Sequence, residues 1–149
     1  LESHYKNRYS TSFTLNKNEK YVDEDLNSRV ARFDFDITNV DANKLTIFLA
    51  ADDDYNSFIK INMKKQTLKF SRRFSYLSKD AMDERKIDID ICDGKLSLCV
   101  LIDRYSIEIF INNGKDVLTS RIYTPLDANE IKFQADGKVD INVCKNEIE

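Results

Sequence analysis

The chain has 149 residues, of which 42% are hydrophobic and 33% are charged, and its formal net charge is −3. This length suits one domain with a substantial core, no apolar run approaches the roughly 20 residues of a membrane-spanning helix, and the slightly acidic balance disfavours phosphate binding. We therefore expect one domain over residues 1–149, with neither a membrane nor a nucleic acid as partner.

Along the chain, apolar residues recur with a period of two, which is typical of strands with one buried face. Residues 31–37 show this best, because the odd positions are apolar and the even positions are charged. Further runs cover Ser12–Leu15 (weakly), Leu45–Ala50, Ser57–Met63, Thr67–Ser71, Arg85–Cys92, Leu96–Asp103, Ser106–Ile111, Val117–Tyr123, Ile131–Ala135 and Val139–Val143. This spacing predicts an all-β fold, an antiparallel two-sheet β-sandwich of the jelly-roll or concanavalin type with about ten strands. Leu77–Glu84 is expected to form one helical turn or a loop.

Two turns predict the register of residues 85–111. We expect two-residue hairpin turns at Asp93-Gly94 and at Arg104-Tyr105. The predicted pairs are Ile91–Leu96, Ile89–Leu98 and Ile87–Val100 in the first hairpin, and Ile102–Ile107, Val100–Ile109 and Leu98–Ile111 in the second. Both hairpins turn the same residues of the shared strand inward, so we predict a three-stranded meander. In this register Cys99 lies opposite Asp88, and a disulfide between Cys99 and Cys92 is not expected.

Residues that usually carry catalysis or bind metals are scarce. His4 is the only histidine, which excludes a histidine-based metal site and disfavours a Ser–His–Asp or Cys–His pair. The cysteines at 92, 99 and 144 lack CxxC spacing, so we interpret them as buried free thiols rather than as a zinc site or a disulfide framework. We expect neither a metal nor a cofactor.

Clusters of charge also have structural interpretations. The loop Asp52-Asp53-Asp54 lacks the spacing of an EF-hand, so we expect a solvated connection rather than a calcium site. Glu108 lies on the strand face opposite Ile107 and Ile109, where we expect it to pair with Arg104 or Arg121 rather than to act as a catalytic acid. The main basic cluster is interpreted as the solvent face of a strand pair; it consists of Lys64, Lys65, Lys69, Arg72 and Arg73.

The three glycines do not form a phosphate-binding loop. Gly94, Gly114 and Gly137 each follow an Asp or Asn. This pattern predicts turns in which the glycine has a positive φ.

Residues 96–125 read LSLCVLIDRYSIEIFINNGKDVLTSRIYTP. This segment resembles the signature of the C-terminal domain of glycoside hydrolase family 32, the group of invertases, levanases and sucrose-6-phosphate hydrolases. Tyr105 stands where a small residue is usual, and the proline is displaced to Pro125. Upstream, residues 67–72 are similar to another family strand, with Ser71 in place of its acid. The matching signature positions are Asp103, Arg104, Ser106, Glu108, Phe110, Asn112, Gly114, Thr119, Ser120, Arg121, Ile122 and Tyr123.

The resemblance implies a role without chemistry of its own. In that family an N-terminal five-bladed propeller carries the catalytic aspartate, the acid/base glutamate and a stabilising aspartate, which hydrolyse β-fructofuranosidic bonds with retention. The propeller's motifs are missing from this chain, so no catalytic residue can be assigned here. The signature residues would be structural, and the partner would be the propeller, joined to this domain through an apolar face. A homodimer contact would be a further role.

Two other functions remain as alternatives. A carbohydrate-binding module for fructan or another glycan would show exposed aromatic residues and polar neighbours in a hollow. An independent enzyme is disfavoured by the scarcity of catalytic residues. The parent's substrate (sucrose, its 6-phosphate or a fructan) is not encoded in this segment, and the free cysteines weakly favour a cytoplasmic parent.

Overall fold

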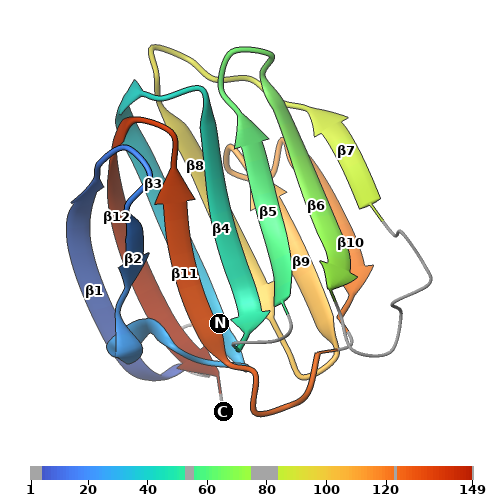
Figure 1. Cartoon of the computed structure of the whole chain (residues 1–149). Helices are drawn as coiled ribbons and strands as arrows, with labels where there is room; N and C mark the ends of the chain where they lie inside the picture. Colours follow the sequence, from blue (N-terminus) through green and yellow to red (C-terminus); the bar gives the residue numbers. More distant parts are fainter. Residues whose placement is uncertain (1–4, 53–55, 75–83, 123, 149) are drawn as a thin grey trace.

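The computed structural model describes residues 5–52, 56–74, 84–122 and 124–148, which form two antiparallel six-stranded sheets (Figure 1). The all-β sandwich predicted from the period of two is therefore confirmed, with twelve strands in this part of the chain instead of about ten. Sheet A has the order β1-β12-β3-β8-β9-β10, and sheet B has the order β2-β11-β4-β5-β6-β7. The strands are β1 (Tyr5–Leu15), β2 (Lys20–Val22), β3 (Ala31–Asp41), β4 (Lys44–Ala51), β5 (Asn56–Asn62), β6 (Thr67–Phe74), β7 (Glu84–Asp88), β8 (Leu96–Ile102), β9 (Ser106–Ile111), β10 (Asp116–Arg121), β11 (Glu130–Ala135) and β12 (Lys138–Ile148).

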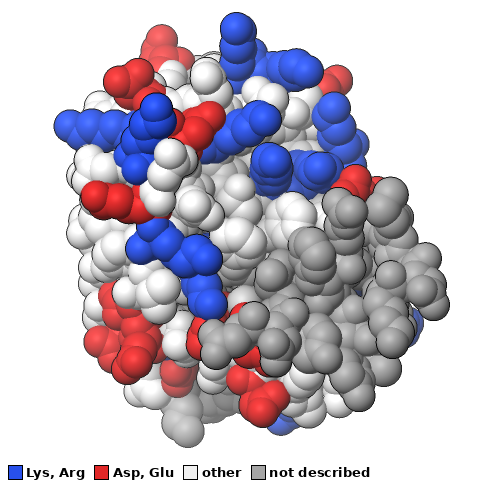
Figure 2. All heavy atoms as spheres, viewed as in Figure 1, with Lys and Arg blue, Asp and Glu red and all other residues white. Residues whose placement is uncertain are grey.

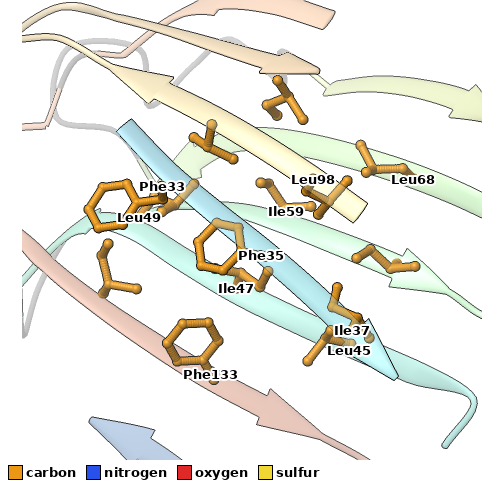
Figure 3. Close-up of a cluster of buried hydrophobic side chains, with 14 of the residues drawn as sticks. Phe33, Phe35, Ile37, Leu45, Ile47, Leu49, Ile59, Leu68, Leu98 and Phe133 are labelled. Atoms are coloured by element: carbon orange, nitrogen blue, oxygen red, sulfur yellow. The ribbon is translucent and has the colours of Figure 1, made fainter. Parts of the chain in front are cut away.

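The core lies between the sheets and follows from the alternation of residue types. Phe33, Phe35 and Ile37 of β3 are fully buried, and so are their counterparts on β4 in the other sheet. Figure 3 shows these side chains gathered between the two layers. Phe35 packs edge-on against Phe133 of β11, with ring centroids 5.9 Å apart. Burying each such phenylalanine stabilises the fold by about 2 kcal/mol.

The second predicted hairpin is confirmed and the first is wrong. Strands β8 and β9 pair in the predicted register, Leu98–Ile111, Val100–Ile109 and Ile102–Ile107. In the first hairpin only the Cys92–Lys95 bridge at the Asp93-Gly94 turn forms. Strand β7 ends at Asp88 and pairs with β6 of sheet B, so Ile87 lies opposite Leu68 instead of Val100.

The physical reason is competition for one edge of β8. That edge pairs with the long apolar strand β3, which places Val100 opposite Phe33. Residues 89–95 therefore cross from sheet B to sheet A. Ile89 is still buried in the core, so alternation predicted which side chains face inward but not which strand they pair with.

The cysteine predictions change with this register. Cys99 lies opposite Asp34 on β3 and Phe110 on β9, and not opposite Asp88. All three thiols are free, but Cys92 is exposed and the other two are half-buried. The expectation that all three are buried is therefore wrong.

The glycine prediction is confirmed at two positions and wrong at the third. Gly94 and Gly114 have φ of 68° and 86°. Gly137 has no positive φ; a Cβ at this position would collide with the carbonyl oxygen of Asp41. Glycine is required there because the β3–β4 and β11–β12 connections, which both cross between the sheets, approach each other closely.

Several expectations fall on or beside segments that are not described. Residues 75–83, which contain most of the possible helical turn, and Asp53 and Asp54 lie outside the described residues, whereas Glu84 begins β7. Strand β2 escaped prediction because three residues are too few to show alternation. Within the described part of the chain, no helix has the length and apolar character of a membrane span.

Candidate functional site: the outer faces of the two sheets

The outward residues of β3, β8, β9 and β10 form the surface that we call the sheet A face. The register places Asp34, Cys99, Phe110 and Val117 side by side in one row across the four strands. A hollow of about 770 Å³ lies over Asp34, Cys99 and Phe110 of this row and is also lined by Leu101. Val117 is 52% exposed although it is apolar, so this side of the sheet offers apolar surface for contact.

The charged groups around this hollow already have partners. Arg32 forms an ion pair with Asp34, with Nε 3.1 Å from Oδ2. The hydroxyl of Ser97 donates a hydrogen bond to Asp36 at 3.1 Å. Burial raises the pKa of the Cys99 thiol to about 11. The surface left for a partner is therefore mainly apolar and contains no activated nucleophile.

A second hollow, of about 470 Å³, adjoins the first and is lined by four of the signature residues: Asp103, Arg104, Ser106 and Glu108. Glu108 is exposed and lies between Leu101 and Thr119 of the neighbouring strands. The register sets Arg121 diagonally from it on the same face, and their pairing stays a prediction. Asp103 accepts a hydrogen bond from the Arg104 amide at 2.6 Å, and its own backbone amide donates to the Ser106 carbonyl oxygen at 2.9 Å, which closes the turn after β8.

Asn112 joins the signature to the upper end of the sheet. Its side-chain amide donates to the carbonyl oxygen of Asp90 at 2.7 Å, and its backbone amide donates to Ser97 at 2.8 Å. Its φ is 52°, a conformation that Asn tolerates better than most residues. Lys115 of the same turn forms an ion pair with the Asp90 carboxylate. The β9–β10 turn is thus tied to the segment that crosses between the sheets.

Arg29 holds the opposite end of the signature and was missed by the sequence analysis. It is 8% exposed, and its guanidinium donates to four carbonyl oxygens at 2.7–3.0 Å, those of Arg104, Thr124, Pro125 and Ala128. It therefore joins the turn after β8 to the segment after β10. A signal existed in the sequence, because Arg29 continues the inward alternation of residues 31, 33, 35 and 37.

This arginine has an unusual environment. Among the described residues no carboxylate lies within ion-pair distance of it, and burial lowers its pKa. Arg29 Nε and the hydroxyl of Thr124 are buried without a hydrogen-bond partner in the described part of the structure. A guanidinium remains charged at neutral pH even so, which makes the surrounding carbonyl oxygens essential to its stability.

The remaining signature residues divide between the two sides of β10. Ser120 and Ile122 face the interior, whereas Thr119 and Arg121 are exposed on the sheet A face. Phe110 and Gly114 line the larger hollow. Tyr123 lies outside the described residues. The structure therefore brings Asp103, Ser106, Glu108 and Phe110 to one face and separates Ser120 from them.

The outward residues of sheet B form the opposite surface, the sheet B face. Figure 2 looks onto this surface, where Lys and Arg side chains gather over its upper half. Lys60, Lys69 and Lys86 lie directly opposite one another on β5, β6 and β7. As predicted, Lys64 and Lys65 are exposed and Lys69 is on the outer side of a strand pair; the side chains of Arg72 and Arg73 are not described.

The features expected of a carbohydrate-binding module are divided between these faces. The paired aromatic residues, Phe48 and Phe58, lie on the sheet B face with ring centroids 6.1 Å apart. The large hollow lies on the sheet A face, where Phe110 is the outward-facing aromatic residue of its lining and Phe35 is a buried one. Over the described residues, no group of three His, Cys, Asp or Glu gathers that could hold a metal ion.

The two six-stranded sheets define an antiparallel β-sandwich, and Asp103, Ser106, Glu108 and Phe110 of the signature share its sheet A face. A family model described as "Glycosyl hydrolases family 32 C terminal" matches residues 1–147. The chain therefore belongs to the family of glycoside hydrolase family 32 C-terminal domains, and the resemblance seen in residues 96–125 is confirmed.

Curated and solved relatives agree with this assignment. A probable sucrose-6-phosphate hydrolase from Vibrio cholerae is 34% identical over 86 residues, which are 57% of this chain and 15% of the relative. Two solved structures share the fold. Exo-inulinase from Aspergillus awamori has a TM-score of 0.82 and 20% sequence identity, and the match covers 95% of this chain and 29% of that one. Sucrose-6-phosphate hydrolase from Lactobacillus gasseri has a TM-score of 0.70 and 22% sequence identity, and the match covers 95% of this chain and 28% of that one. The chain thus spans less than a third of the length of each of these proteins.

Proposed function

We propose that this chain is the non-catalytic C-terminal accessory domain of a longer β-fructofuranosidase-type glycoside hydrolase. Its parent would act on sucrose, sucrose-6-phosphate or a fructan, and a five-bladed propeller before Leu1 would do the chemistry. The observation that carries the proposal is the family match over residues 1–147 in a chain that covers 15% of its curated relative. Retaining glycosidases need two carboxylates held about 5 Å apart, and no catalytic pair of this kind is assigned among the signature residues.

The sheet A face is the surface that we propose to pack against the propeller. It combines exposed Val117 and half-buried Phe110 with the Arg32–Asp34 ion pair and with Asp36, which accepts a hydrogen bond from Ser97. Removing water from such a face costs little free energy, because few charged groups would be buried without a partner. The hydrogen bonds of Arg29 and Asn112 would hold this face in shape from its two ends.

The proposed role in the parent's oligomer is supported by apolar residues elsewhere on the surface. Val22 is 49% exposed on the edge strand β2, and Leu126 is 48% exposed after β10. Both offer contact area to a second copy while the sheet A face is covered. Sedimentation of the complete protein tests this role, and a monomer at high concentration would contradict it.

Two experiments test the main proposal. The coding sequence before Leu1 should encode a propeller, and the isolated chain should release no reducing sugar from sucrose, sucrose-6-phosphate or inulin. In the complete protein, the double variant F110E/V117E should lower the melting temperature of the propeller, whereas the control K17E, at an exposed position in the turn after β1 and away from the sheet A face, should not. Hydrolysis by the isolated chain, or an unchanged propeller in the double variant, would contradict the proposal.

Fructan binding ranks second because the paired aromatic residues and the large hollow, which a fructan site would combine, lie on different faces. It is kept because the hollow of about 770 Å³ contains Phe110 beside polar side chains. Titration of the chain with levan and inulin at millimolar sugar, followed by calorimetry, tests it directly. The absence of heat with both polymers would exclude this function.

A further inference from the structure

The sheet B face carries a local excess of positive charge on a chain with net charge −3. Six lysines alternate outward on its strands, against three acids, Glu84, Asp88 and Glu130. The lysines are Lys20, Lys44, Lys60, Lys69, Lys86 and Lys132. Figure 2 shows the resulting band of basic side chains over this side of the molecule. Such segregation favours an anionic partner for this face.

The centre of this band is a row of like charges. Lys60 lies opposite Lys69, and Lys69 lies opposite Lys86. Like charges directly opposite in neighbouring strands are destabilising. Compensation inside the chain is small: Lys69 is 3.9 Å from Glu84, while Lys60 and Lys86 form no ion pair with any described residue. An anion bound along the row would remove this repulsion.

Aromatic surface lies directly beside the lysine row. Phe48 and Phe58 are cross-strand partners on β4 and β5 and are both half-buried. Lys20 lies over the Phe48 ring, 5.5 Å from its centroid. Thr46 and Gln134 continue the lysine row across β4 and β11. The face therefore combines cations, apolar ring surface and uncharged hydrogen-bonding groups.

We propose that the sheet B face binds an acidic polysaccharide whose chain runs across the strands along the row Lys60–Lys69–Lys86. Adjacent strands are about 4.8 Å apart, which is close to the length of one pyranose unit in an extended polysaccharide. Successive units of an extended chain alternate in orientation, so every second unit would present its charged group to the protein. Two such groups, about 9.6 Å apart, would meet Lys60 and Lys86, with Lys69 between them. Phe48 and Phe58 would cover the apolar side of a neighbouring sugar ring, as aromatic side chains with exposed flat surface can do.

Two other polyanions fit this spacing less well. Successive side chains on one side of an extended acidic peptide are about 6.7 Å apart, so its carboxylates would fall out of step with the lysines. Single-stranded nucleic acid is usually held by bases stacked on aromatic rings. Here the two rings contact each other at an interplanar angle of 56°, and a lysine lies over one of them. Both polymers serve as competing outcomes in the test.

This inference concerns the face opposite the one proposed to meet the propeller. It does not depend on the parent's activity, because the 149-residue chain carries all the residues involved. If the chain binds an acidic polysaccharide but no propeller precedes Leu1, this inference stands and the proposed function fails. If a propeller precedes Leu1 but the chain does not bind an acidic polysaccharide, the proposed function stands and this inference fails.

The test measures binding of the 149-residue chain to polygalacturonate by calorimetry and by affinity electrophoresis. Neutral inulin, poly-L-glutamate and single-stranded RNA are the comparison polymers. We expect binding to polygalacturonate that weakens steeply with salt, weaker binding to poly-L-glutamate and RNA, and none to inulin. No binding to polygalacturonate, or equal or stronger binding to poly-L-glutamate or RNA, would overturn the proposal.

Matched variants locate the site. The triple variant K60Q/K69Q/K86Q should lose about tenfold or more in affinity, which corresponds to 1.4 kcal/mol. The control K17Q/K95Q/K138Q removes the same charge from exposed lysines elsewhere and should keep the affinity. F48A should weaken binding to polygalacturonate without affecting any residual binding to poly-L-glutamate. Far-UV circular dichroism and melting curves confirm folding; a folded triple variant with unchanged affinity, or an equal loss in the control, would refute the site.

Discussion

The outer faces of the two sheets are built from the same alternation but treat their charges in opposite ways. On the sheet A face, Arg32 pairs with Asp34 and Ser97 with Asp36, and the surface between them is apolar. On the sheet B face, Lys60 and Lys86 have no ion-pair partner in the described chain. The large hollow of the sheet A face, whose charged side chains have partners, suits a dry contact, whereas the lysine row, in which Lys60 and Lys86 have no ion-pair partner among the described residues, suits a charged ligand.

The two faces also differ in how they are fixed. Arg29 and Asn112 form hydrogen bonds that fix the turns at opposite ends of strands β8–β10, which carry the sheet A face. The lysine row is held only by the strand pairing of β5, β6 and β7. We therefore expect substitutions that loosen the sheet A face to cost stability, and substitutions in the lysine row to leave the fold intact.

The largest effect is expected for Arg29→Met. It leaves four carbonyl oxygens without their donor and should lower the free energy of unfolding by about 3 kcal/mol. Arg29→Lys should lose nearly as much, because an ammonium group cannot reproduce the planar fork of donors. Urea unfolding followed by circular dichroism measures both, with the exposed Arg8→Met as control. A loss no larger than in the control would show that Arg29 does not hold this end of the sandwich.

Next in size is the reactivity of Cys99 on the sheet A face. Its pKa is raised from 9.0 to about 11, so about 100-fold less thiolate is present near pH 8 than for an unshifted thiol. Alkylation should be slow in the folded chain, should accelerate about tenfold per pH unit up to about pH 11, and should be fast in urea. Mass spectrometry of iodoacetamide-treated protein resolves Cys99 from exposed Cys92. Fast labelling of Cys99 at pH 8 in the folded chain would show that the hollow is more hydrated than its burial implies.

The predictable parts of this fold were those set by local alternation. The period of two identified the sandwich, the inward set of β3 and the β8–β9 register, because side-chain parity and a short turn decide each of them. The pairing of β7 depended on competition between two sheets, which residues 85–92 alone do not encode. The alternation of residues 29–37 indicates that Arg29 faces inward, but it does not identify the groups that Arg29 contacts. Its acceptors are backbone carbonyl oxygens far along the chain, which no residue type in the sequence indicates.

The candidate site shows the same division. The signature segment placed Asp103, Ser106, Glu108 and Phe110 on one face, as strand parity requires. The lysine row on sheet B combines residues from three separate strands, and only Lys69 of the three belonged to the predicted basic cluster. Cross-strand rows depend on register, and two of the five strand pairings in sheet B, β2–β11 and β11–β4, join strands that are not consecutive in the chain.

A smaller effect is expected for Asn112→Ala. The carbonyl oxygen of Asp90 loses its donor, and alanine must adopt a φ near 52°, so the free energy of unfolding should fall by about 1–2 kcal/mol. Asn112→Gly removes the same hydrogen bond but accepts this φ, and its loss should be smaller. Urea denaturation of the two variants separates backbone strain from the hydrogen bond. Equal losses would mean that the φ at this position carries no strain.

The smallest effect, Lys60→Gln, tests whether the lysine row is a strained surface. Removing one charge beside Lys69 should raise the free energy of unfolding by a few tenths of a kcal/mol at low salt. The gain should vanish at 1 M salt, where charges are screened within about 3 Å. Lys69→Gln should gain less, because it also loses the contact with Glu84, and Lys17→Gln should change nothing. If Lys60→Gln is instead destabilising, the row does not repel itself and one reason for expecting an anionic ligand is lost. If the gain appears and disappears with salt as expected, the lysines of the row repel one another in the native chain, and this repulsion is what a bound acidic polymer would remove.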